Sequence, residues 1–247
     1  AFSHLQQLGT QPWLVIGWMV LGLIGLAAFI WFTRRSKQPL IKLTIFKTRS
    51  FDWHLLGFFL IQINALGLAF ILPNYIQLVN GKSALLAGLF VLPGAAIGAI
   101  FAPLGGRILD SFGAAKPILT GSTIIALAVA LFTVFGLHLT GALILVLYII
   151  FMVGMGLTMG NTMTSGLSQL NVKQQADGNA VFNTLQQFAG ATGTSIVSAV
   201  ITLVQTQASG SNAHRTALGS AAALGVLLVL ILLNLVVLIN AMRTRKA

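Results

Sequence analysis

Few side chains in this 247-residue chain could carry acid–base or nucleophilic chemistry. Its acidic residues are Asp52, Asp110 and Asp177, and it has four histidines but no glutamate or cysteine. An enzyme would need several such groups clustered at one place, and these are scattered along the chain. The lack of cysteine also removes thiolate metal ligands, and no Walker-type phosphate loop is present. The sequence therefore predicts no enzyme, no metal site and no cofactor.

Asp110 lies within GGRILDSFGAAKP, residues 105–117, between two long apolar runs. There it would end a helix, where the negative end of the helix dipole disfavours a carboxylate by about 0.3–1 kcal/mol. We expect Arg107, Lys116 or the positive end of a neighbouring helix to compensate. Gly113 permits a tight turn, and Pro117 suits the first turn of a following helix. The plainer alternative is a solvated turn whose charges only mark topology.

The elements that would position these residues are apolar. The chain is 57% hydrophobic and 7% charged, with a mean hydropathy of +0.94, so it cannot cover itself with a soluble surface. A helix needs about 20 apolar residues to cross a bilayer. Seven runs satisfy this length: 13–32, 53–78, 84–108, 117–137, 141–165, 181–206 and 217–241. The predicted fold class is an all-α membrane protein with seven transmembrane helices.

Basic residues gather in alternate loops between these runs. Twelve of the 14 lysines and arginines fall on one side of the predicted membrane, and only Lys82 and Arg215 fall on the other. Topology explains this alternation better than a nucleic-acid patch would. By the positive-inside tendency, the twelve face the cytoplasm. We therefore expect a multi-pass protein of the cell membrane, plasma or inner, with a cytoplasmic C-terminus.

Residues 33–52 form the longest polar stretch and divide one helix from a group of six. The predicted domains are a transmembrane helix within 1–32, a cytoplasmic linker at 33–52 and a six-helix bundle at 53–247. The linker is expected to place Ile45 and Phe46, among other apolar residues, against lipid in a short surface helix.

Small residues and prolines within the runs indicate close packing and bending of helices. Pairs of glycines four residues apart let helices approach closely, and prolines remove backbone donors. Gly156 and Gly160 form one such pair. The other candidates for packing or bending are Pro93, Gly94, Gly98, Pro103, Gly190 and Gly193.

Neutral polar side chains lie inside the predicted membrane spans and must find partners there. Asn234, isolated among leucines, is expected to hydrogen-bond to another helix. Amides beside aromatic rings would suit a bulky amphipathic substrate, although the same spacing fits a plain core stripe. The cavity candidates are Phe58, Gln62, Asn64, Phe70, Asn74, Asn183 and Gln186. The histidines, at positions 4, 54, 138 and 214, are expected at helix ends or in loops.

The pattern of Gly106, Asp110, Gly113 and Lys116 resembles the cytoplasmic loop motif of the major facilitator superfamily. In that family the motif joins the second and third helices of a six-helix half. Here Ser111 replaces a frequent arginine of the motif, and Ala114 replaces another. The resemblance implies a conformational latch made of Gly106, Arg107, Asp110, Gly113 and Lys116.

Longer stretches resemble the second half of fourteen-helix drug:proton antiporters of the EmrB/QacA type. They are QPLIKLTIFKTRSF, LPNYIQLVNGKSALLAGLFVLPG and GNAVFNTLQQFAGATGTSIVSAVI. By this resemblance, 13–32 is the last linking helix and 53–241 is the C-terminal half-bundle. The family often carries arginine where this chain has Gln186.

The resemblance implies the C-terminal half of a proton-coupled exporter of hydrophobic or cationic compounds. Alternating access would rock this bundle against the missing N-terminal half, which carries the family's proton-linked carboxylates. The expected partners are the lipid bilayer, a small substrate and that missing half, with no nucleic acid. The alternatives are a transporter of a sugar or another metabolite, a seven-helix receptor or light-driven pump, and a membrane enzyme. Retinal attachment would need a lysine within the membrane, and none is predicted there.

Overall fold

The computed structural model describes residues 43–244 and seven earlier positions, namely 17, 20–22, 24, 25 and 31. Over residues 43–244 it contains a short 3-10 helix and six long α-helices. They are η2 (Leu43–Lys47), α2 (Arg49–Leu78), α3 (Ala84–Phe112), α4 (Ala115–Val134), α5 (Gly141–Leu167), α6 (Val172–Gln207) and α7 (Asn212–Arg243). All six α-helices are long and apolar enough to cross a membrane. The predicted all-helical membrane fold is therefore confirmed.

The first predicted membrane helix, 13–32, lies mostly outside the described residues. The seven earlier positions that are described have helical backbone. The linker up to residue 42 also lies outside, while its last part forms η2 and the first turn of α2.

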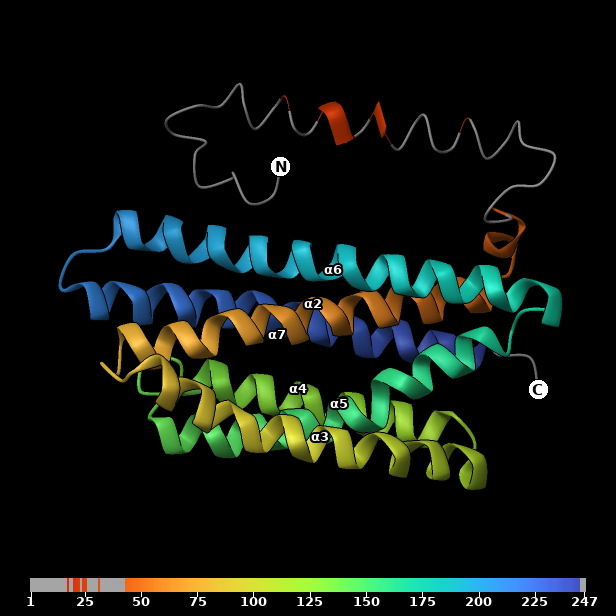
Figure 1. Ribbon diagram of the computed structural model, residues 1–247, viewed down its shortest axis with the longest axis horizontal. Helices are drawn as coiled ribbons and strands as arrows, with labels where there is room; N and C mark the ends of the chain where they lie inside the picture. Colours follow the sequence, from red (N-terminus) through yellow and green to blue (C-terminus); the bar gives the residue numbers. More distant parts are fainter. Residues whose placement is uncertain (1–16, 18–19, 23, 26–30, 32–42, 245–247) are drawn as a thin grey trace.

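Consecutive helices run in opposite directions and are joined by short connections (Figure 1). Three helices that begin at the same end are capped by a hydroxyl that accepts a backbone N–H: Ser83 for α3, Thr140 for α5 and Ser211 for α7. At the other end Gly113 closes α3 with φ +78°, a conformation that glycine adopts without strain. The tight turn expected at this glycine is therefore present.

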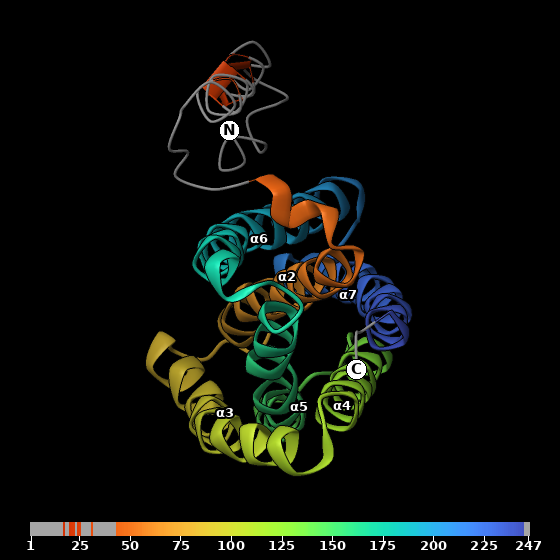
Figure 2. The same ribbon diagram turned by 90° about the vertical axis from the view of Figure 1, so that its right-hand side faces the viewer.

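Helix α2 lies near the middle of the bundle and packs against α5, α6 and α7 (Figure 2). Helix α5 packs against α3 and α4, and α7 closes the bundle by contacting both α4 and α6. As expected, Asn234 of α7 hydrogen-bonds across helices, because its Nδ2 donates to Ser122 Oγ of α4 at 3.3 Å. By contrast, α3 and α6 have the smallest buried shares of the six helices. One side of the bundle therefore leaves these two helices largely uncovered.

Glycines set the closest approaches between helices. On α3, a Cβ added at Gly94 would overlap the ring of Tyr148, and one at Gly98 would come within 2.7 Å of Met152 Cε. On α6, a Cβ at Gly190 would overlap Leu66, and one at Gly193 would lie 2.6 Å from the backbone oxygen of Ile63. The two prolines of α3, Pro93 and Pro103, lie inside the helix, and α3 stays continuous through both.

A small aromatic cluster lies where η2 meets the bundle. Ile45 is fully buried there with Phe51, Phe58 and Phe182, and the rings of Phe58 and Phe182 meet edge to face at 5.0 Å between centroids. The expectation that Ile45 faces lipid was wrong, because η2 folds back onto α2 and α6. Phe46 does remain exposed.

Candidate functional site

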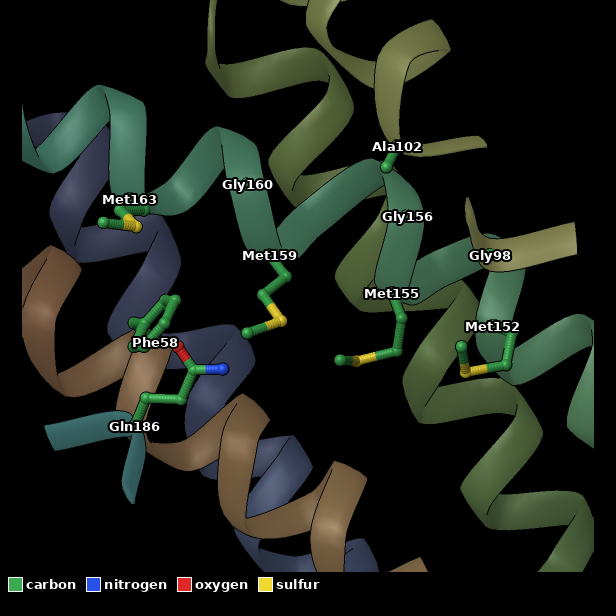
Figure 3. A pocket seen from close by; sticks show the side chains of 10 residues that line it. All are labelled: Phe58, Gly98, Ala102, Met152, Met155, Gly156, Met159, Gly160, Met163 and Gln186. Carbon is green, nitrogen blue, oxygen red and sulfur yellow. The ribbon is translucent and has the colours of Figure 1, made fainter. Parts of the chain in front are cut away.

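Four methionines on one face of α5 line a pocket of about 290 Å³. They are Met152, Met155, Met159 and Met163, at helical spacings of three and four residues. The remaining walls come from three other places: Phe58 of α2, Gly98 and Ala102 of α3, and Gln186 of α6, together with Gly156 and Gly160 of α5 itself. Figure 3 shows Gln186 beside the ring of Phe58, with its amide directed toward Met159.

The pocket exists because α3 and α6 lie on either side of α5 and leave part of its face uncovered. Helices α5 and α6 touch only slightly, whereas α3 lies tightly along α5. Glycine also leaves space in the wall, since a Cβ added at Gly160 would meet no atom within 4 Å. The opening therefore lies on the same side of the bundle that leaves α3 and α6 uncovered.

The lining is apolar except for one amide. Methionine side chains are flexible and polarisable, so they adapt to differently shaped apolar molecules and make favourable contacts with aromatic rings. The amide of Gln186 can both donate and accept hydrogen bonds with a bound molecule. No charged side chain lies among the lining residues that the structure describes. The arrangement suits a mostly apolar molecule that carries one hydrogen-bonding group.

Two of the cavity candidates, Phe58 and Gln186, meet in this pocket. Gln62 and Asn64 are buried in α2 and do not line it. Asn64 Nδ2 donates to the backbone oxygen of Leu60 at 3.0 Å. The side-chain oxygens of both amides have no hydrogen-bond partner among the described residues. These two candidates are thus embedded in the helix packing.

The other three cavity candidates lie elsewhere. Phe70 and Asn74 line a separate pocket of about 140 Å³ near the opposite end of α2. Asn183 is exposed on α6, where its Nδ2 donates to the backbone oxygen of Asn179 at 2.9 Å. The sequence thus pointed to several polar positions that the fold separates.

The loop motif, from Gly106 to Lys116, spans the end of α3, the turn at Gly113 and the start of α4. Asp110 is exposed, and none of the described residues gives its carboxylate an ion-pair or hydrogen-bond partner. Instead of pairing with Asp110, Lys116 holds its Nζ 4.6 Å from the centroid of the Phe112 ring. Arg107 is exposed, and a side chain at Gly106 would meet open space. In this conformation the motif leaves its carboxylate available to another partner.

His54 lies in the second turn of α2, near the helix end where it was expected, and it is fully buried. Its Nδ1 donates to the backbone oxygen of Ser50 at 2.7 Å, because a carbonyl can only accept. In the neutral ring Nε2 then accepts from the Ser165 hydroxyl at 2.9 Å. His54 thereby links α2 to α5 next to Gly166, where a side chain would collide with it.

Sequence reasoning missed the methionines. Their spacing of three, four and four residues places them on one helical face, and that signal was present in the sequence. A methionine stripe on an apolar helix is also typical of ordinary core packing, so only the uncovered face of α5 identifies it as a pocket wall.

The profile of the Major Facilitator Superfamily matches residues 4–194 of the sequence. This match covers more than half of the chain and includes the Asp110 loop and all the residues that line the methionine pocket. The chain belongs to the Major Facilitator Superfamily. This membership excludes the seven-helix receptor and the membrane enzyme, since the family consists of transporters.

Curated relatives of this family member include proteins named for drug resistance. The lincomycin resistance protein LmrB of Listeria monocytogenes is 31% identical over 205 residues, which are 83% of this chain and 44% of that protein. The multidrug resistance protein Stp of Mycobacterium tuberculosis is 32% identical over 123 residues, which are 50% of this chain and 23% of that protein. The uncharacterized transporter YhcA of Bacillus subtilis is 29% identical over 201 residues, or 80% and 38% of the two chains. The chain thus spans less than half the length of these relatives.

Proposed function

We propose that this chain is the C-terminal half of a proton-coupled multidrug efflux transporter of the fourteen-helix EmrB/QacA type. The observation that carries the proposal is the methionine-lined pocket with its single amide. A sugar would need several hydrogen-bonding side chains around it, whereas this lining offers only Gln186. The relatives named for lincomycin and multidrug resistance support the same substrate class.

The uncovered side of the bundle supports a second six-helix half as the partner. Helices α3 and α6 carry exposed apolar side chains such as Leu92 and Phe188. Covering this side would enclose the pocket between two bundles, as alternating access about a fixed site requires. The proton-coupling carboxylates would then belong to the partner half, because this chain places its three aspartates at the loop ends of helices.

In this proposal Gln186 orients the substrate and the methionines provide its apolar surface. Phe58 forms the end wall, held by its edge-to-face contact with Phe182. Gly106, Arg107, Asp110, Gly113 and Lys116 act as the cytoplasmic latch.

The test compares Gln186→Ala with Gln187→Ala in the full-length protein. Gln187 is the exposed neighbour and does not line the pocket, so it is a matched control. Loss of one neutral hydrogen bond should weaken export of hydrogen-bonding substrates by about 2- to 10-fold. Efflux of lincomycin and of an apolar dye is measured in cells under an imposed proton gradient.

The expected result is a selective change, in which Gln186→Ala lowers lincomycin efflux more than dye efflux and Gln187→Ala changes neither. The assignment of the pocket would be contradicted if the unchanged protein and both variants exported lincomycin at one rate and also exported the dye at one rate. Efflux at the same rate with and without the imposed proton gradient would contradict the proposed proton coupling.

A further inference from the structure

A second, polar pocket of about 370 Å³ lies at the far end of the bundle from the Asp110 loop. Three helices contribute to it at their ends: α2 at Leu78, α6 from Thr202 to Thr206, and α7 from Asn212 to Thr216. The connection between α6 and α7 lies at this end together with that between α2 and α3 (Figure 1). The pocket adjoins the smaller one that Phe70 and Asn74 line, because Leu78 and Thr216 belong to both.

Arg215 is the charged residue of this pocket, and its hydrogen-bond partners among the described residues are neutral. Its Nη2 donates to Asn212 Oδ1 at 2.7 Å, and its Nη1 donates to the backbone oxygen of Gln205 at 3.5 Å. The Nε–H of the same guanidinium is buried and has no hydrogen-bond partner within the part of the chain that the structure describes. The guanidinium therefore keeps both an unsatisfied donor and an unbalanced charge.

The acidic side chains of this chain cannot supply the missing negative charge. They are Asp52 in the first turn of α2, Asp110 in the last turn of α3, and Asp177 near the start of α6, all at the opposite end of the bundle. Arg215 also lies in the first turn of α7, where the positive end of the helix dipole disfavours a cation. An anion from outside the chain would therefore stabilise this half-buried arginine.

The depth of the pocket indicates which anion this is. Arg215 directly precedes the apolar part of α7, so it lies at the level of the lipid headgroups. Leu78 and Leu203 at the same end are 56% and 60% exposed, and they provide apolar surface next to the polar pocket. A phospholipid would match this arrangement, with its phosphate at the polar pocket and its acyl chain against the exposed leucines.

We propose that this pocket binds the phosphate group of a phospholipid through Arg215. The planar guanidinium lines the pocket, where its positive charge can hold a phosphate oxygen, while Asn212 keeps the guanidinium in place. The leucines contact the first part of the acyl chain. The proposal is independent of the transported substrate, since the methionine pocket shares no residue with this one.

The test measures lipid binding to the purified full-length protein after its lipids have been removed in detergent. Phosphatidylglycerol is titrated in, and native mass spectrometry counts the lipids bound to each protein. Diacylglycerol, which lacks the phosphate, and inorganic phosphate are titrated as separate probes.

We expect Arg215→Gln to weaken the tightest phosphatidylglycerol site by about tenfold or more, since a charge-assisted hydrogen bond is lost. Lys82→Gln is the matched control, because Lys82 is the other lysine or arginine at this end among residues 43–244 and is exposed in the α2–α3 connection. That variant should bind within about twofold of the unchanged protein, since an exposed charge contributes little. Diacylglycerol should not occupy the site in any of the proteins.

Three results would overturn the proposal. Unchanged phosphatidylglycerol binding by Arg215→Gln would exclude Arg215 as the residue that binds the phosphate. Diacylglycerol binding as tight as that of phosphatidylglycerol would exclude phosphate recognition. Displacement of the lipid by inorganic phosphate at equal concentration would assign the site to free anions. If Arg215→Gln does not fold, Arg215→Lys is measured instead; it keeps the charge but loses the fork, and lipid binding equal to that of the unchanged protein would exclude the guanidinium fork as the phosphate contact.

Discussion

Two charged side chains of this protein lie at helix ends that disfavour their charge. Asp110 lies at the negative end of α3 and Arg215 at the positive end of α7. Neither finds an opposite charge among the described residues. By contrast, the buried His54 satisfies both ring nitrogens within the bundle. Asp110 and Arg215 therefore mark the places where an oppositely charged group from outside the described residues could bind.

Replacing Asp110 by Asn keeps the side-chain shape and removes the charge. If the carboxylate pairs with the other half of the transporter in one conformation, its loss should lower efflux by about tenfold, the value of one charge-assisted hydrogen bond. Dye efflux from cells with matched amounts of membrane-inserted protein measures the effect. Asp177→Asn is the control, because Asp177 lies on α6 outside the loop motif. Unchanged efflux with Asp110→Asn would rule out the latch.

At the scale of helices, glycines decide where α5 packs and where it stays open. Gly156 lies against the backbone of α3, since an added Cβ would come 2.8 Å from the oxygen of Gly98 and 3.0 Å from the nitrogen of Ala102. Gly160, one turn later, meets nothing within 4 Å. The two glycines form a pair in the sequence, yet only the first is used for close packing. The second leaves room in the methionine pocket.

The pair provides a matched test of helix packing. Gly156→Ala should destabilise the protein by about 1–3 kcal/mol, because backbone atoms cannot move aside for the new methyl group. Gly160→Ala should leave stability unchanged or slightly higher, since alanine favours a helix by up to about 1 kcal/mol. Thermal unfolding of both variants in the same detergent measures the difference. Equal melting temperatures would show that α3 and α5 do not pack this closely.

For the molecule as a whole, the two ends of the bundle differ in charge. Within residues 43–244, the end that holds η2 carries Lys47, Arg49, Arg107, Lys116, Lys173 and Arg243, and the other end carries Lys82 and Arg215. The three aspartates share the η2 end and leave it basic overall. This asymmetry favours a cytoplasmic location for that end.

Single cysteines can test this orientation, because the chain has none of its own. Ser209→Cys, exposed between α6 and α7, should react with a membrane-impermeant maleimide added to intact cells. Ser168→Cys, exposed at the end of α5, should react only after the cells are opened. The reverse pattern would invert the topology. The full-length protein is used, with any cysteines outside this chain replaced.

The sequence by itself determined the helices, their approximate limits and the separation of charges. Whether a segment spans a bilayer depends on its own hydropathy, its length and the charges that flank it, and all three are local properties of the sequence. It also indicated the interhelical hydrogen bond of Asn234 and the turn at Gly113, because in each case the type of a single residue is enough to predict the feature. Only the tertiary structure decided that His54 and Ile45 are buried, that Gly156 packs while Gly160 does not, and that the methionines face a pocket with Gln186. These features depend on how each helix is rotated against its neighbours, and that rotation follows from contacts between residues far apart in the chain.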